Sequence, residues 1–229
     1  MSKDALSVSL EEGPRLYRGL AAVTAALVWP FVRIDTLQLG VAHRTRTAVV
    51  IANHRSLFDA AVGLVAFHRL KRYPRVIVAA QFFERRSTGP LLRMAGAIPM
   101  NRDDPSVHLD AAKRVLDAGI PLLILPEGRL CGEPGRPATA GDFKTGAARL
   151  AAHCGAGVWP LALVGTDEIW PRGRRTPRRG LRRSRRVVLL GHQQTLDVDG
   201  DPRRSTDELR AEMIELLEEA AAIHGADGA

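Results

Sequence analysis

The amino-acid sequence predicts an α/β domain in which helices flank a mostly parallel central sheet. Short apolar segments typical of buried strands alternate along the chain with longer amphipathic segments typical of helices. One strand segment, 47–52 (TAVVIA), is almost wholly apolar, as expected for a strand covered on both faces. The length of 229 residues and the 45% hydrophobic content fit one such domain with at most a small appendage.

The first element is an uncharged segment, 19–32 (GLAAVTAALVWPFV), which lies between Arg18 and Arg33. As a helix it would extend about 21 Å, which is shorter than the roughly 30 Å hydrocarbon core of a bilayer. We therefore expect residues 1–34 to form an apolar helical segment at the membrane interface, interfacial or re-entrant and not spanning. The alternative is a buried first helix packed on the domain.

Residues 35–229 form the expected α/β domain. Its expected strands are 36–39, 47–52, 75–80, 120–125, 158–164 and 186–190, with a short apolar strand before residue 102. Its expected helices are 56–70, 105–118, 143–153 and a closing helix from Ser205, where Ser205 and Glu208 fit a capping box. Ligands of such sheets bind at the carboxyl ends of the strands, so we expect functional residues in the loops that follow them.

Charge is concentrated in one segment. The chain has a net charge of +8, but nine of its 33 basic residues are arginines within 172–186, and the remainder of the chain is nearly neutral. This arginine-rich segment predicts contact with an anionic membrane surface, with a solvated linker as the alternative. No aromatic residue interleaves with these arginines, so we expect no nucleic-acid partner.

Cysteine content and the amino terminus bear on the compartment. Cys131 and Cys154 are too few for a disulfide framework and fit no zinc-binding spacing, which predicts a reducing compartment and no metal site. The first fifteen residues are charged and lack the apolar core of a secretory signal, so we expect a cytoplasmic protein.

The loop after the strand 47–52 carries the first candidate catalytic residues, in the segment 53–59 (NHRSLFD). A histidine is the usual general base near neutral pH, and a carboxylate bonded to its second ring nitrogen stabilises the imidazolium. Residues five apart on a helix point about 140° apart, so His54 must precede the helix for its side chain to meet Asp59. Alternatively, Ser56 and Asp59 form a capping box and His54 is an ordinary loop histidine.

A second loop carries a candidate phosphate ligand, Arg102, directly after the short apolar strand. A guanidinium group matches phosphate oxygens bidentately, so an arginine at a strand end could bind a phosphate. Because Asp103 and Asp104 follow, the alternative is a surface ion pair.

A third loop follows the strand 120–125 and contains Glu127, Gly128 and Arg129. A carboxylate, a glycine that permits close backbone approach and an arginine could together position a hydroxylated, phosphorylated acceptor, although a plain turn would have the same composition. Downstream, the segment 143–146 (FKTG) opens a helix whose first amides could add to an anion site.

Taken together and in this order, the motifs resemble those of the glycerolphosphate acyltransferase family, especially its 1-acylglycerol-3-phosphate acyltransferases. The resemblance covers about residues 15–195. It is carried by Asn-His-x4-Asp at 53–59, an apolar segment into Arg102, Pro-Glu-Gly-Arg at 126–129, Phe-Lys-Thr-Gly at 143–146 and Val-Trp-Pro at 158–160.

The resemblance implies a mechanism that uses His54 and Asp59 as the catalytic pair. His54 would take the proton from the free hydroxyl of the acceptor while that oxygen attacks an acyl thioester, and Asp59 would stabilise the imidazolium. The acyl donor would be acyl-CoA or an acyl-carrier protein, and neither a metal nor a cofactor is required.

The resemblance also implies the binding residues. Arg102 would bind the acceptor phosphate, Glu127 and Gly128 would belong to the acceptor site, and Pro160 would lie near the acyl pocket. The third motif departs from the family pattern, because Arg129 directly follows Gly128 where the family usually has a threonine. This departure makes the phosphate role of Arg129 less secure than that of Arg102 and leaves the acceptor open.

The expected protein is therefore a peripheral or monotopic acyltransferase on the cytoplasmic face of a membrane. Its expected partners are a lysophosphatidate-type lipid, the acyl donor and the anionic membrane surface. One alternative keeps the chemistry with another acceptor, such as a lysophospholipid, an aminolipid or a specialised metabolite. The other is a non-catalytic membrane-binding protein, based on the arginine-rich segment and the apolar first helix.

Overall fold

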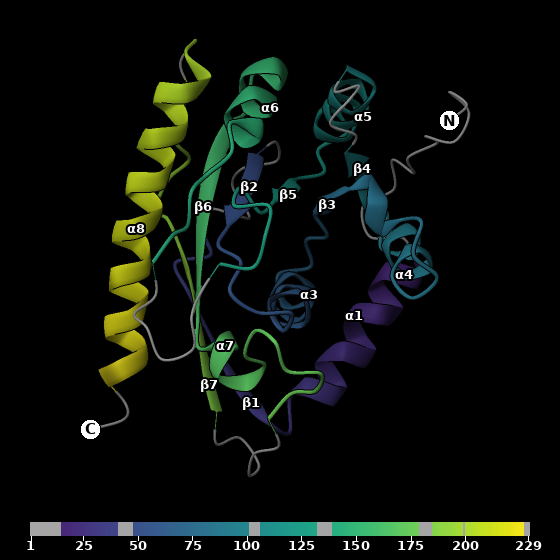
Figure 1. Cartoon of the computed structure of the whole chain (residues 1–229), viewed down its shortest axis with the longest axis vertical. Coiled ribbons are helices and arrows are strands. Elements are labelled where there is room, and N and C mark those ends of the chain that lie inside the picture. The colour runs from purple at the N-terminus through teal and green to yellow at the C-terminus, as the bar shows by residue number, and fades with distance from the viewer. Residues whose placement is uncertain are drawn as a thin grey trace.

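A seven-stranded sheet forms the centre of the computed structural model, which describes residues 15–40, 48–100, 106–131, 139–178, 185–198 and 200–226. The strands lie in the order β1-β7-β6-β2-β5-β3-β4 (Figure 1). They are β1 (Val32–Leu37), β2 (Ala48–Ala52), β3 (Arg75–Ala79), β4 (Ile98–Met100), β5 (Leu122–Ile124), β6 (Gly157–Val164) and β7 (Arg185–Gly191). Neighbouring strands run parallel except β6 and β7, which confirms the mostly parallel sheet predicted from the sequence.

Helices cover both faces of this sheet. They are α1 (Arg15–Val28), α3 (Asp59–Arg69), η2 (Ala80–Phe82), α4 (Gly89–Met94), α5 (Ser106–Asp117), α6 (Gly146–Cys154), α7 (Thr166–Ile169) and α8 (Pro202–Ala226). Helices α5, α6 and α8 share one apolar cluster, and α3, with α1 packed against it, contributes to a second cluster. Figure 1 shows α8 and α1 on opposite sides of the sheet.

Strand β2 connects the two apolar clusters. All five of its residues are buried, with Val49 and Ile51 in the cluster of α5, α6 and α8, and Val50 and Ala52 in the cluster of α3. Successive side chains of a strand point to opposite faces, so a central strand covered on both sides needs an apolar residue at every position. The loop that follows β2 therefore starts from a rigid, fully buried strand.

The apolar segment 19–32 is not one helix. Helix α1 ends at Val28 because Pro30 follows, and a residue before a proline is disfavoured in a helix. The chain then enters β1 at Val32, four residues before the predicted start of this strand, and the positive φ of Gln38, 54°, follows its end. The strand predicted at 36–39 is therefore β1, and the prediction placed it too far toward the carboxyl terminus.

Helix α1 is apolar on both sides. Tyr17, Ala21 and Val28 are buried, whereas Val23 and Leu27 on the opposite side are 58% and 67% exposed. One side of α1 is thus packed on the domain, as in the alternative interpretation. The placement of α1 at a membrane interface stays a prediction. Within the described ranges, no helix combines the length and apolarity needed to cross a bilayer.

The closing helix begins earlier than predicted, at Pro202. Proline is favoured at the first helical position, and the Asp201 carboxylate accepts a hydrogen bond from the Arg203 N–H at 2.9 Å. Ser205 lies inside the helix and is buried, and Glu208 pairs with Arg204 instead. The capping box expected at Ser205 was therefore wrong.

Candidate active site

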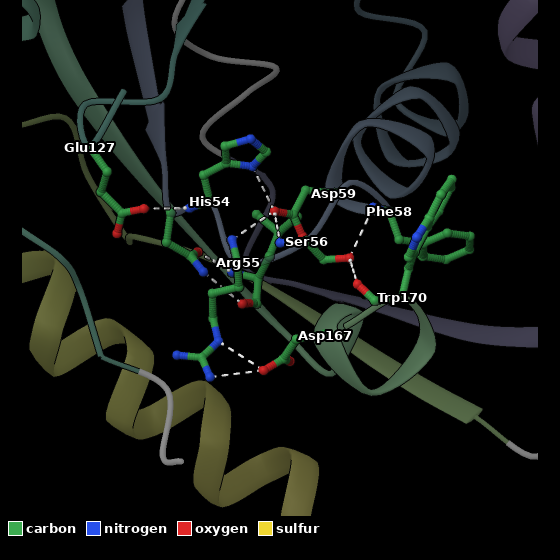
Figure 2. Close-up of polar contacts among 10 residues, drawn as sticks. His54, Arg55, Ser56, Phe58, Asp59, Glu127, Asp167 and Trp170 are labelled. Carbon is green, nitrogen blue, oxygen red and sulfur yellow. Dashed lines mark hydrogen bonds and ion pairs between the residues drawn. The ribbon is translucent and has the colours of Figure 1, made fainter. Parts of the chain in front are cut away.

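The predicted pair of His54 and Asp59 meets at the carboxyl end of β2 (Figure 2). His54 lies in the loop directly after the strand, and Asp59 is the first residue of α3. Their contact joins His54 Nδ1 to Asp59 Oδ2 at 2.9 Å, with the imidazole 21% and the carboxylate 5% exposed. The contact occupies Nδ1 and leaves Nε2 as the ring nitrogen that can exchange a proton with a substrate.

Asp59 holds the loop as well as the histidine. Its Oδ2 accepts hydrogen bonds from the N–H groups of Arg55 and Ser56, both at 2.9 Å. The Ser56 hydroxyl in turn accepts from the Phe58 N–H at 3.0 Å. The same carboxylate oxygen thus contacts the His54 imidazole and the Ser56 N–H, but α3 begins at Asp59 after Phe58, so Ser56 is not the cap of this helix.

Glu127 supports the loop from the turn that follows the neighbouring strand β5. It is 1% exposed, and its two carboxylate oxygens accept hydrogen bonds from the N–H groups of His54 and Gly141, each at 2.9 Å. Burial raises the pKa of Glu127 above that of an ordinary glutamate, although these N–H donors act in the opposite direction. Cys131 donates its N–H to the His54 carbonyl oxygen at 2.6 Å, so both backbone groups of the histidine are held.

Asn53 is a structural residue that the motif contained but to which the sequence assigned no role. Its side-chain amide donates to the Leu163 carbonyl at 2.9 Å and its side-chain oxygen accepts from the Leu163 N–H at 2.7 Å. The amide thereby acts like a further peptide group between β2 and β6. The signal in the sequence that could have indicated this role is a polar residue directly after a wholly apolar strand.

Helix α7 supports the opposite side of the loop. Arg55 is 3% exposed, and its guanidinium group binds the Asp167 carboxylate through Nη2 at 2.8 Å and Nε at 3.2 Å. The Ser56 hydroxyl donates to the Trp170 carbonyl at 2.8 Å. Sequence reasoning missed these contacts because the partners are more than 110 residues apart and no spacing relates them.

The turn of the third motif lies next to the supporting carboxylate. Gly128 is exposed with a φ of 61°, a left-handed conformation that favours glycine. A Cβ atom at this position would lie 2.8 Å from the Lys144 amine, so that amine packs directly over the turn. Arg129 is exposed beside it. The structure thus places two cations, Arg129 and Lys144, at the loop after β5.

Pro160 and Arg102 are the two remaining predicted site residues. Pro160 is buried in β6, opposite Ile51 in the register of β2, so it lies within the sheet and not at its carboxyl edge. Arg102 lies outside the residues that the structure describes. Within the described ranges, no group of three or more histidine, cysteine or acidic residues has the arrangement of a metal site.

Exposed apolar side chains share the edge of the sheet with the candidate catalytic pair. Strand β1 is parallel to β7, and β7 is antiparallel to β6, so the start of β1 lies at the edge where β2 and β6 end. Trp29 and Phe31, just before β1, are 52% and 56% exposed, and Leu57 in the loop between β2 and α3 is 54% exposed.

The arginine-rich segment reaches the same edge. Its residues 172–178 are exposed, and Arg185 and Arg186 begin β7, while residues 179–184 lie outside the described part of the chain. The Arg186 guanidinium binds Asp35 at 2.7 Å and is therefore a structural residue within the segment.

Comparisons with known proteins agree with one another. Residues 34–164 match the family model described as Acyltransferase. The chain is 31% identical over 150 residues to the chloroplastic 1-acyl-sn-glycerol-3-phosphate acyltransferase LPAT1 of Arabidopsis thaliana, and 30% identical over 150 residues to the chloroplastic enzyme BAT2 of Brassica napus. These matches cover 64% of this chain but only 40% and 41% of the two plant proteins, so the chain matches about two fifths of their length.

A solved structure shows the same fold. It is the crystal structure of the 1-acyl-sn-glycerophosphate (LPA) acyltransferase PlsC from Thermotoga maritima, with a TM-score of 0.66. The match covers 90% of this chain and 78% of that chain at 21% sequence identity. At this identity the comparison establishes a shared arrangement of strands and helices.

Proposed function

The chain belongs to the acyltransferase family, and from this premise we propose that it transfers a fatty acyl group from an acyl thioester to the free hydroxyl of a lysophosphatidate-type acceptor. The observation that carries the proposal is the 2.9 Å contact between His54 Nδ1 and Asp59 Oδ2 at the carboxyl end of β2. A histidine oriented in this way by a buried carboxylate is equipped to act as a general base.

His54 and Asp59 divide the proton transfer between them. His54 Nδ1–H donates a hydrogen bond to the Asp59 carboxylate, which leaves Nε2 unprotonated. Nε2 then takes the proton of the acceptor hydroxyl while the hydroxyl oxygen bonds to the thioester carbonyl carbon. Asp59 stabilises the imidazolium that results. The tetrahedral intermediate then collapses, its carbon–sulfur bond breaks, and the leaving thiolate takes the proton from His54. No covalent enzyme intermediate is needed.

The catalytic loop offers a donor for the oxyanion of that intermediate. The N–H groups of His54, Arg55, Ser56 and Phe58 all donate to acceptors within the protein. Leu57 is the residue of this loop whose N–H has no acceptor among the described residues. We therefore assign the Leu57 N–H as an oxyanion donor, a type of group that stabilises developing negative charge strongly in a preorganised site.

The acceptor phosphate is assigned to cationic side chains. Arg102 stays the proposed principal phosphate ligand. Arg129 and Lys144 at the Gly128 turn add positive charge after β5. Because Arg129 directly follows Gly128, whereas the family usually has a threonine between the glycine and the arginine, a lysophospholipid, aminolipid or specialised metabolite acceptor is the second candidate.

The proposed location is the cytoplasmic face of a membrane, as a peripheral or monotopic protein. The exposed Trp29 and Phe31 lie at the same sheet edge as the catalytic pair, and an anionic leaflet would attract the exposed arginines of 172–178. Docking by this edge would bring His54 to the surface where acyl chains are held. The acyl donor in this proposal is acyl-CoA or an acyl-carrier protein, and no cofactor or metal takes part.

Thiol release tests the proposal. The protein, mixed with acyl-CoA and lysophosphatidate in detergent micelles, should release free thiol at a rate that depends on the acceptor concentration. The His54→Ala variant should show no acceptor-dependent thiol release. Release with another lysophospholipid but not with lysophosphatidate would favour the second candidate. Absence of release with every acceptor and with both donor types would contradict the proposed activity.

A further inference from the structure

A cationic cavity lies away from the candidate active site, between α1 and the carboxyl end of α3. It has a volume of about 410 Å³ and is lined by Arg18, His68, Lys71 and Tyr73. Asp59 is the first residue of α3, and the cavity lies at the opposite end of this helix. The length of α3 separates the two by about 15 Å along the helix axis, at 1.5 Å per residue. The cavity is therefore separate from the catalytic pair.

The charges that line this cavity are not neutralised within the described chain. Arg18 and Lys71 are exposed, and neither makes an ion pair or side-chain hydrogen bond with another described residue. The buried Arg55 guanidinium, by contrast, is paired with Asp167. Two cations that share one small cavity repel each other, and an anion between them removes this repulsion.

Lys71 occupies a backbone position that favours glycine. Its φ is 53°, and the bonds from Lys71 N–H to the His68 carbonyl and from Arg72 N–H to the Phe67 carbonyl form the usual left-handed helix end. A lysine is strained at such a position, where glycine fits freely. The negative end of the helix dipole favours a cation here, so the fold accepts the lysine while its side chain lines the cavity.

His68 is oriented by its neighbour. The Tyr73 hydroxyl lies 3.2 Å from His68 Nδ1, and the two rings meet edge to face. If the hydroxyl donates this bond, the imidazole carries its proton on Nε2 and presents an N–H donor. Tyr73 is itself buried and packs edge to face against Tyr17 of α1, with ring centres 5.3 Å apart. These aromatic contacts make the cavity wall a rigid part of the junction between the two helices.

We propose that this cavity binds a phosphate group, which Arg18, Lys71 and the His68 imidazole contact. Guanidinium, ammonium and imidazole N–H groups are the donors that proteins use for phosphate oxygens, and phosphate would relieve the repulsion between the two cations. The group belongs either to a phospholipid headgroup or to a free anion. The site is independent of the proposed acyl transfer, because no residue of the catalytic loop takes part in it.

The ring signal of His68 in an NMR spectrum reports occupancy directly. Inorganic phosphate should shift this signal saturably in the full chain, and chloride at the same ionic strength should not. The signal is identified among those of the seven histidines by its loss in His68→Gln. No saturable shift in the wild type would overturn the proposal.

Lys71→Gly separates binding from folding. The substitution removes the ammonium but supplies the residue that the left-handed backbone favours, so its Tm should be equal to or up to about 3 °C above that of the wild type. Its phosphate affinity should fall about tenfold or more, as expected for the loss of a charged hydrogen bond. Unchanged affinity in this variant would overturn the assignment.

Vesicles distinguish the two sources of the phosphate. The double variant Arg18→Gln, Lys71→Gln is compared with Lys113→Gln, Arg149→Gln, which removes the same charge from α5 and α6. If a headgroup is bound, the first variant floats with phosphatidate vesicles several-fold less than the second, and phosphatidate displaces inorganic phosphate. If the two variants float equally while only the second retains the phosphate-induced shift, a free anion is the ligand. Loss of the shift in the second variant as well would overturn the site.

Discussion

The two ends of helix α3 differ in how their polar groups are satisfied. At the amino end, Asp59 Oδ2 contacts the His54 imidazole and two backbone N–H groups, and the surrounding loop is bonded to β5, β6 and α7. At the carboxyl end, Arg18 and Lys71 face a cavity without any partner among the described residues. The charged side chains at the amino end are thus held by contacts within the protein, whereas in our proposal the cations at the carboxyl end contact a bound phosphate.

This difference predicts two kinds of mutational effect. Groups that are already positioned reduce the reorganisation needed at the transition state, so changes at the amino end should lower kcat. Groups that meet only a bound ligand should change affinity while kcat stays close to normal. The Arg18 and Lys71 variants described above test the carboxyl end, and the experiments below, ordered from the largest expected effect to the smallest, test the amino end and the proposed acceptor ligands.

His54→Ala should give the largest effect. We expect kcat to fall by about 10²–10⁴-fold, the usual contribution of a general base. The Tm should change little, because the imidazole lies at the surface of a loop that its backbone bonds to Glu127 and Cys131 still hold. His153→Ala on α6, an exposed position, is the control and should keep normal turnover. Equal activity in both variants would contradict the role of His54.

Leu57→Pro tests the oxyanion assignment. Proline removes the backbone N–H, and we expect kcat to fall by about 10²-fold. Leu57→Ala keeps the N–H and should retain most of the activity, so the contrast separates the amide from the side chain. Thermal unfolding of both variants checks the fold. A folded Leu57→Pro variant with the turnover of Leu57→Ala would exclude this amide.

Arg102→Ala should show an effect on affinity. We expect the KM for a phosphorylated acceptor to rise about tenfold or more while the KM for the acyl donor stays the same. Arg129→Ala should raise the acceptor KM less. If Arg129→Ala were the more damaging change, the phosphate would have to be assigned to the turn after β5.

Asp167→Asn should give the smallest loss of kcat, about tenfold, with both KM values nearly unchanged. The substitution leaves the Arg55 guanidinium without its charged partner, and we expect stability to fall by about 1–3 kcal/mol. Denaturant unfolding and steady-state kinetics measure the two effects. A higher kcat in Asp167→Glu than in Asp167→Asn would show that the carboxylate positions the loop for catalysis. Wild-type kcat in Asp167→Asn would show that the carboxylate contributes to stability alone.

The sequence predicted the elements whose signal is local. The alternation of buried strands and helices, and the position of His54 in a loop before Asp59, follow from periodicity and spacing. The boundaries near Pro30 and Pro202 were less accurate because proline and capping contacts moved them by several residues. Local sequence patterns thus defined the fold class and the candidate pair, but not the exact ends of elements.

Contacts between distant segments could not be predicted. Asn53 meets Leu163, and Arg55 meets Asp167, across 110 and 112 residues, because the parallel sheet places β2 beside β6. Nothing in either segment alone specifies its partner. For the same reason, Glu127 was predicted only as part of the acceptor site, although its carboxylate also binds the His54 N–H.

Asp59→Asn provides the most direct test of the central claim that a charged Asp59 assists His54 in acyl transfer. Asparagine keeps an oxygen that can accept from Arg55 and Ser56 and is itself a good helix cap, so the Tm should fall by only a few degrees, in line with a cost of about 1 kcal/mol. The loss of charge should nevertheless lower kcat for acceptor-dependent thiol release by about 10²-fold or more. Near-normal turnover by the folded variant would show that Asp59 serves only to hold the loop before α3, and would contradict the account.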